Sequence, residues 1–209
     1  PVIALFCNII VVTGNSINYV RAGNHNLKSL IPFIIGSIPS AFVGGTLIIE
    51  KEIFEILLFL VLSVAGILLL INIKAYEDKK IVIKKLNYFV SILIGSFLGL
   101  ISGLIGIGGG IFLSPILFLL KADKPKNIIT TASLFILLNS IFGIFGQLTK
   151  DNIINELSSY LPLFLVVLIG GLIGNYLNIK IFSNRTLTLI TSLLVILVAF
   201  RMGLKLFYN

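Results

Sequence analysis

Residues 86–120, which read LNYFVSILIGSFLGLISGLIGIGGGIFLSPILFLL, contain no charged side chain. One continuous helix of these 35 residues would be about 52 Å long at about 1.5 Å per residue, far more than the roughly 30 Å of a bilayer's hydrocarbon core. Four glycines and a proline interrupt the stretch: Gly106, Gly108, Gly109, Gly110 and Pro115. Each glycine inside a helix costs about 1 kcal/mol relative to alanine. The stretch therefore predicts a helical hairpin with legs 86–105 and 111–120. The second leg spans only about 15 Å, so the glycine tip lies either inside the membrane or on a tilted pair of legs.

Six further stretches lack charged residues and approach the roughly 20 residues that a membrane-spanning helix needs: 2–20, 30–49, 56–73, 127–149, 157–179 and 186–200. None shows the alternation of polar and apolar residues that marks an outer-membrane barrel. The predicted fold class is an all-α polytopic membrane protein.

The composition supports the same class. Hydrophobic residues make up 57% and charged residues 11% of the 209 positions, and the mean hydropathy is +1.12. A soluble domain carries about a quarter charged residues. One cysteine and one histidine leave too few ligands for a zinc or haem site, so we expect no metal and no cofactor. Because the chain starts at Pro1 and its only methionine is Met202, we expect that it lacks its natural N-terminus.

The net charge of +8 is explained by orientation rather than by nucleic acid, because the basic residues lie between the apolar stretches. If the hairpin begins and ends on one face, twelve of the sixteen Lys and Arg residues share that face. If the short leg fails to return, the split is ten to six. By the positive-inside rule, the first arrangement is favoured, the basic face is cytoplasmic, and residues 74–85 form a basic cytoplasmic loop. The expected location is the cell membrane.

Weak internal similarity relates the first three spans to the last three. Asn8 aligns with Asn139, and after a one-residue slip Pro32 aligns with Pro162 and Gly44 with Gly174. Under the predicted orientation the two copies run in opposite directions, and inverted repeats are typical of secondary transporters. Chance matching of glycine and proline in apolar sequence is the alternative.

Three segments resemble the sulfite exporter TauE/SafE family: SGLIGIGGGIFLSPILFLL (102–120), TTASLFILLNS (130–140) and LPLFLVVLIGGLIGNYL (161–177). The resemblance covers the chain from about residue 2 to its end. It implies a permease for sulfite, sulfonates or related sulfur-containing anions, and a first hairpin that precedes this sequence. One transporter domain, 1–209, would then comprise repeat 1 (1–73, without its hairpin), the loop 74–85 and repeat 2 (86–209). The family usually has Thr-Ser before Leu where this chain has Ala132, Ser133 and Leu134, which weakens a hydroxyl role there.

The candidate substrate site is the glycine tip together with polar residues inside the spans. A helix that begins within the membrane presents unpaired amides and the positive end of its dipole to an anion. The alternative interpretation of the tip glycines is close helix packing, because Gly106 and Gly110 form a G-x-x-x-G pair. Two further pairs of this kind occur, at 99–103 and 170–174, and for these we favour packing. Polar residues in lipid need partners, although Ser and Thr can bond their own helix backbone and Asn can bond a neighbouring helix. The predicted substrate-binding residues are Gly108, Gly109, Gly110, Ser114, Thr131, Ser133, Asn139 and Asn8.

No Lys, Arg, Asp or Glu lies in the middle of any span. If transport is coupled to protons, the proton therefore travels on the substrate, as in hydrogen sulfite, or uses the expected first hairpin. An intramembrane enzyme would need an acid, base, nucleophile or metal set, which the spans lack. The predicted function is a transporter of a small sulfur-containing anion in the lipid bilayer, with assembly as a homo-oligomer left open. The alternative is a non-transporting membrane assembly or scaffold protein.

Overall fold

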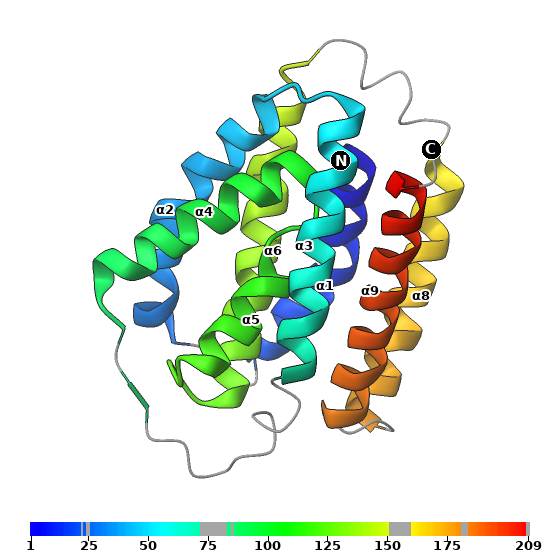
Figure 1. The fold of residues 1–209 in the computed structure, drawn as a ribbon. Helices are drawn as coiled ribbons and strands as arrows, with labels where there is room; N and C mark the ends of the chain where they lie inside the picture. The colour runs from blue at the N-terminus through cyan, green and yellow to red at the C-terminus, as the bar shows by residue number, and fades with distance from the viewer. Residues whose placement is uncertain are drawn as a thin grey trace.

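The computed structural model describes residues 1–21, 23, 26–71, 83–84, 86–150, 160–180 and 184–207. All of the secondary structure in these ranges is helical (Figure 1). The helices are α1 (Val2–Arg21), α2 (Leu27–Thr46), α3 (Lys51–Ile71), α4 (Tyr88–Ile105), α5 (Gly110–Leu119), α6 (Pro125–Gln147), α8 (Leu161–Lys180) and α9 (Asn184–Phe207).

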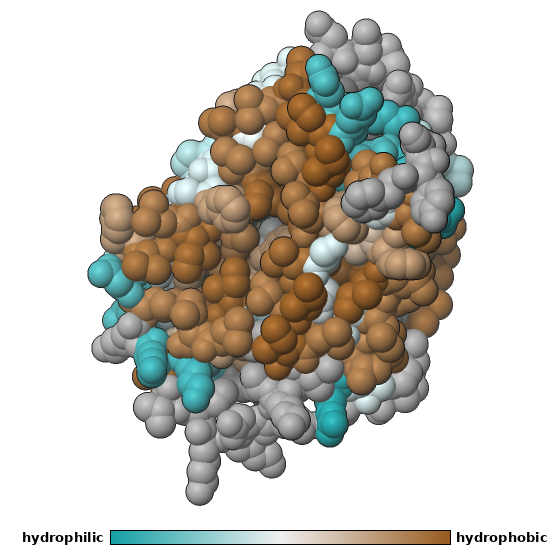
Figure 2. All heavy atoms as spheres, in the orientation of Figure 1, coloured by the Kyte–Doolittle hydropathy of each residue, from teal (hydrophilic) through white to brown (hydrophobic). Residues whose placement is uncertain are grey.

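The helices have the lengths and surfaces of membrane spans. Six of the described helices are long and apolar enough to cross a membrane, and α5 and the apolar part of α8 are shorter. Large side chains such as Phe97, Leu165 and Phe200 are each 66% exposed. In Figure 2, apolar side chains cover the middle of the molecule and hydrophilic residues gather toward its two ends. The chain is thus an all-α, multi-pass membrane protein, as predicted.

The predicted hairpin is present, and both of its ends lie at the same end of the bundle. The amide of Lys84, before α4, donates to the carbonyl of Lys121, after α5, over 3.0 Å. At the same end, the Asn26 Nδ2 atom donates to Asp123 Oδ2 over 2.7 Å and joins the α1–α2 connection to the α5–α6 connection. We call this the basic end, formed by residues 23, 26–28, 83–84, 86–88 and 119–127. Its assignment to the cytoplasm and the inverted-repeat relationship stay predictions.

The opposite end is held by a second set of contacts. Lys150 Nζ donates to the carbonyl of Leu47 over 2.7 Å and to Gln147 Oε1 over 3.1 Å. Gln147 is buried, and its Nε2 atom donates to the carbonyl of Gly103 over 3.0 Å. These bonds join α2, α4 and α6 where α2 and α6 end.

Glycines allow α2 and α4 to pack backbone to backbone, the most extensive helix contact among the described residues. A Cβ on Gly99 would lie 2.7 Å from Ser37 Cα, and one on Gly103 would lie 2.7 Å from the Gly45 amide nitrogen. Packing at 99–103 is therefore confirmed. At Gly170 and Gly174 a Cβ would meet no atom of the described residues within 4 Å, so the prediction of close packing is not met there.

The hydrophobic core surrounds the short leg α5. Its fully buried members include Phe33 of α2, Leu113 of α5, and Ile128 and Phe135 of α6. Because α5 has ten residues and is about 15 Å long, it extends from the basic end only to the middle of the bundle. The glycine tip, residues 106–109, is buried there apart from the half-buried Ile107.

Candidate substrate-binding site

The tip between α4 and α5 has a backbone that only glycine adopts readily. Gly106, Gly108 and Gly109 have φ angles of +86°, +79° and +70°, and an L-residue in the left-handed conformation costs about 1–2 kcal/mol. Gly106 ends α4 by donating its amide to the Ser102 carbonyl over 2.8 Å. The chain then reverses and begins α5 at Gly110.

The start of α5 presents backbone amides to the interior of the bundle. The amides of Phe112 and Leu113 both donate to the Gly109 carbonyl, over 3.2 and 3.3 Å. The amides of Gly110 and Ile111 belong to the first turn, which has no carbonyl partner within its own helix. Together with the dipole of α5, they give this buried point a positive potential.

Helices α1 and α6 enclose the tip at contact distance. Asn8 Nδ2 donates to the Gly106 carbonyl over 3.2 Å. A Cβ added to Gly108 would lie 3.1 Å from Asn8 Nδ2 and 3.2 Å from Ser140 Oγ, and one on Gly110 would lie 2.9 Å from the Ala132 carbonyl oxygen. The structure thus brings Asn8 and the three predicted glycines together in one place.

Four polar side-chain atoms inside the bundle have no hydrogen-bond partner among the described residues: Ser37 Oγ, Ser102 Oγ, Asn139 Oδ1 and Ser140 Oγ. All four residues are fully buried, whereas the large majority of buried polar atoms in proteins are paired. Ser140 borders Gly108, and the Cβ of Ser102 lies 3.4 Å from a Cβ built on Gly109. The tip is therefore surrounded by unpaired hydroxyls as well as by amides.

The sequence analysis did not single out Ser37, Ser102 or Ser140. Each stands in an apolar stretch, and Ser140 directly follows the predicted Asn139. Serine in a membrane span usually returns its hydroxyl to the helix backbone, so its presence alone carried no signal. Two features of the sequence could have pointed to these serines: Ser102 lies in the predicted hairpin, and Ser140 directly follows the predicted site residue Asn139.

The other predicted residues lie in different surroundings. Ser114 is half-buried, one turn after Gly110 and on the same side of α5. The hydroxyl of Ser133 is 2.9 Å from that of Ser16 in α1. Thr131 is buried and lines a cavity at the basic end. Eight residues separate it from Asn139, which is about 12 Å along α6.

The cavity at the basic end has a volume of about 390 Å³ and a mixed lining that includes Lys28, Ser29, Tyr88, Ser91 and Asp123. Asp123 is buried and accepts hydrogen bonds from Asn26, Ser29 and Asn127 side chains and from the Lys124 amide. Its carboxylate thus holds together the two connections that contribute residues to the cavity's lining. The sequence analysis missed Asp123 because it lies outside the apolar spans.

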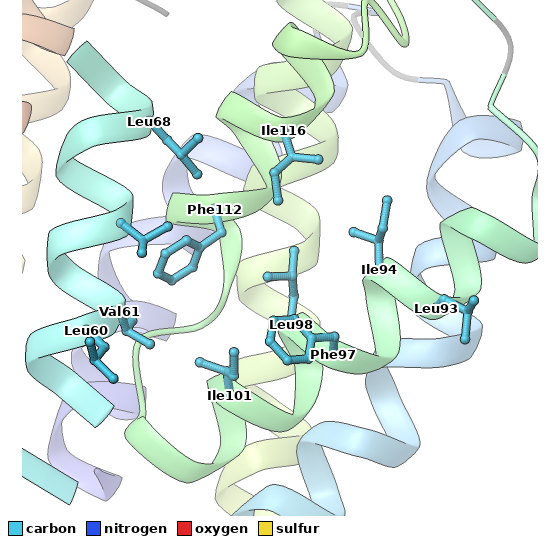
Figure 3. Close-up of a pocket in the computed structure, with 11 residues that line it drawn as sticks. Leu60, Val61, Leu68, Leu93, Ile94, Phe97, Leu98, Ile101, Phe112 and Ile116 are labelled. Carbon is cyan, nitrogen blue, oxygen red and sulfur yellow. The ribbon is translucent and has the colours of Figure 1, made fainter. Parts of the chain in front are cut away.

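A second cavity, of about 490 Å³, lies between α3, α4 and α5 (Figure 3). Every lining residue is apolar, and Figure 3 shows Val61, Phe97, Leu98 and Phe112 among them. Such a cavity suits hydrocarbon rather than an anion. Among the residues that the structure describes, no three His, Cys, Asp or Glu side chains are grouped so that they could hold a metal ion.

Comparison with known proteins gives a consistent result. The family model "Sulfite exporter TauE/SafE" matches residues 1–202. The chain is 27% identical over 207 residues to "Probable membrane transporter protein y4hK" of Sinorhizobium fredii, which covers 98% of this chain and 81% of that protein. It is 25% identical over 220 residues to "Probable membrane transporter protein YunE" of Bacillus subtilis, covering 96% of this chain and 78% of the relative.

A probable membrane transporter protein of Methanocaldococcus jannaschii is 29% identical over 192 residues, covering 85% of this chain and 69% of the relative. No solved structure matches the chain significantly. The names of these relatives confirm the interpretation of the chain as a membrane transporter rather than an enzyme.

Proposed function

Because the chain belongs to the sulfite exporter TauE/SafE family, we propose that it carries a small sulfur-containing anion, such as sulfite or a sulfonate, across the cell membrane. The anion's oxygen atoms bind at the glycine tip between α4 and α5. The first turn of α5 and the hydroxyls of Ser102 and Ser140 are the donors.

The observation that carries this proposal is the buried start of α5 beside unpaired hydroxyls. Helix packing explains the glycines, but it does not explain why the Ser102 and Ser140 hydroxyls lie fully buried next to the tip with no hydrogen-bond partner among the described residues. The helix dipole places roughly half a positive elementary charge at the start of a helix. Since no Lys or Arg lies in the middle of any span, this dipole and the amides provide the attraction for an anion.

The two ends of the bundle suggest how substrate reaches the tip. At the basic end the cavity extends inward to Thr131, and Phe135, one turn further along α6, contacts the tip: a Cβ on Gly109 would lie 3.0 Å from its ring. At the opposite end, Gln147 and Lys150 bond α4 and the end of α2. In this arrangement the substrate enters from the basic end and passes Phe135, while the Gln147 contacts close the other side.

Alternating access then requires the Gln147 contacts to open when the basic end closes. Helices α1 and α6 run antiparallel. Ser16, late in α1, contacts Ser133, early in α6, whereas Asn8, earlier in α1, and Ser140, later in α6, both border Gly108. Opposed copies of one repeat would have this relation, which supports a movement of two inverted bundles around the tip.

A flux assay in proteoliposomes tests the proposal, with sulfite, sulfate, thiosulfate and a sulfonate as probes. We expect flux of at least one of the sulfur oxyanions and its loss in Gly109→Leu, whose side chain would meet Phe135 and Leu98. Gly170→Leu is the matched control, because Gly170 faces open space among the described residues. Flux no higher than in empty vesicles for every anion would reject transport and favour the assembly-protein alternative. Normal flux in Gly109→Leu would reject the tip as the site.

A further inference from the structure

The side chain of Asn139 is bound on one side only. Its Nδ2 atom donates to the Phe135 carbonyl over 2.8 Å, while Oδ1 is buried and has no partner among the described residues. Turning the amide over would put Oδ1 against the Phe135 carbonyl oxygen, and two acceptors do not bond. The unpaired atom is therefore an acceptor, not a donor.

Asn139 lies on the face of α6 that borders the glycine tip. The α6 residues in contact with the tip include Phe135, Ile136 and Ser140. On a helix of 3.6 residues per turn, position 139 falls between positions 135 and 136 in direction, one turn further along. The unpaired acceptor thus belongs to the same buried region as the donors of the tip.

An acceptor in this position restricts the ligand. The amides of α5 and the serine hydroxyls can donate to the oxygen atoms of any oxyanion. An anion that carries no hydrogen of its own leaves Asn139 Oδ1 buried and unpaired, which is costly. An anion with an O–H or N–H group satisfies it.

The charge of the site restricts the ligand further. Among the described residues, the side chains nearest to the glycines at 108–110 are uncharged: Asn8 from α1, Ser102 from α4, and Phe135, Ile136 and Ser140 from α6. A second negative charge would have no cationic side chain among these nearest described neighbours, in a medium where isolated charges are expensive.

We propose that the tip selects a monovalent oxyanion carrying a hydrogen-bond donor, and that Asn139 Oδ1 accepts this hydrogen bond. This inference rests on the proposed transport function. It names the form of the substrate: a hydrogen oxyanion, or a sulfonate bearing an amino or hydroxyl group next to sulfur, in preference to a dianion or an alkyl sulfonate.

Sulfamate and methanesulfonate form a matched pair of probes for this proposal. Both are monovalent and carry one sulfonate group, but sulfamate has an amino group where methanesulfonate has a methyl group. Uptake of each is measured with the wild-type chain in proteoliposomes. We expect kcat/KM to be at least about tenfold higher for sulfamate, a factor equivalent to about 1.4 kcal/mol.

Two variants separate the role of Asn139 from general damage to the site. Asn139→Leu keeps a γ-branched side chain but removes the acceptor, so the ratio of sulfamate to methanesulfonate uptake should fall to about one. Ser140→Ala removes a donor to the sulfonate oxygens that both probes share, so both uptakes should fall and the ratio should persist.

Equal wild-type uptake of the two probes would overturn the inference and leave anion transport standing. A preference for sulfamate that survives in Asn139→Leu would overturn it as well. Absence of flux for every anion would instead overturn the proposed function on which the inference rests.

Discussion

Replacing Gly108 by alanine tests both the backbone and the spacing of the tip. The φ angle of Gly108 is +79°, so alanine there loses about 1–2 kcal/mol of stability through its backbone alone. The new Cβ would also lie 2.7 Å from Ile136 Cγ2, 3.1 Å from Asn8 Nδ2 and 3.2 Å from Ser140 Oγ. The Ile136 methyl cannot turn aside easily, because β-branched side chains have one strongly preferred rotamer in a helix. Overpacking of this kind costs a further 1–3 kcal/mol, roughly.

Gly23 offers a matched control for the backbone contribution. Its φ angle is +71°, and a Cβ there would meet no atom of the described residues within 4 Å. Gly23→Ala should therefore lower the free energy of unfolding by only the backbone cost, about 1–2 kcal/mol. Gly108→Ala should lower it by about 2–5 kcal/mol. Denaturant unfolding in detergent micelles measures both.

Transport separates the two variants more sharply. The added methyl group in Gly108→Ala occupies the space between Asn8 and Ser140, where the anion would bind. We expect uptake to fall by at least about tenfold, equivalent to about 1.4 kcal/mol, while Gly23→Ala transports like the wild type once protein amounts are equalised. Equal destabilisation by the two changes, or wild-type uptake by Gly108→Ala, would refute the close approach of α1 and α6 to the tip.

The two G-x-x-x-G pairs should respond differently to alanine. Gly103→Ala drives a methyl group into the α2 backbone and should destabilise the protein by about 1–3 kcal/mol, whereas Gly174→Ala should raise its stability by up to about 1 kcal/mol, because alanine is the better helix former and a Cβ there meets no described atom within 4 Å. Thermal unfolding in detergent compares them, and destabilisation by both changes would contradict the difference in packing. Ser133→Ala removes the hydrogen bond to Ser16 and should lower the free energy of unfolding by about 1 kcal/mol without reducing uptake. A tenfold loss of flux would instead place Ser133 in the substrate site. Asp123→Ala removes the acceptor that joins the two connections at the basic end and should lower stability by about 3 kcal/mol. Asp123→Asn retains one carbonyl oxygen and should lower it less, so equal losses would show that the carboxylate's hydrogen bonds do not hold the two connections together.

The hairpin could be predicted from sequence because its causes are local. The uncharged stretch is too long for one span, and the glycines offer one place to reverse. The predicted legs 86–105 and 111–120 therefore differ by at most two residues at each boundary from α4 (Tyr88–Ile105) and α5 (Gly110–Leu119). None of these four boundaries depends on how the helices pack.

The surroundings of individual polar residues could not be predicted in the same way. Ser133 and Ser140 lie on similar sides of α6, seven residues apart, and the sequence gives no reason to distinguish them. The register of α1 along α6 does: it places Ser16 opposite Ser133 and Asn8 beside Ser140. As a result, the Ser133 hydroxyl has a side-chain partner, whereas the Ser140 hydroxyl has none among the residues that the structure describes. Likewise, two glycine pairs with the same spacing have different surroundings. The pair 99–103 packs against α2, whereas the pair 170–174 faces open space among the described residues. The motif permits another helix to come close, but it does not determine whether one is there.

The unpaired groups at the tip argue that the break between α4 and α5 serves a ligand. The stretch is too long to cross the bilayer as one helix, but within hydrocarbon the cheapest arrangement is one in which helices satisfy their backbone amides internally. Here the chain instead interrupts the helix, adopts three left-handed residues at 106, 108 and 109, and leaves the buried hydroxyls of Ser102 and Ser140 without partners in the part of the chain that the structure describes. Each of these features lowers stability on its own. A bound oxyanion compensates for all of them at once, because its oxygen atoms accept from both the amides and the hydroxyls. Adding a transported anion should therefore raise the unfolding temperature of the wild type and leave that of Gly109→Leu unchanged.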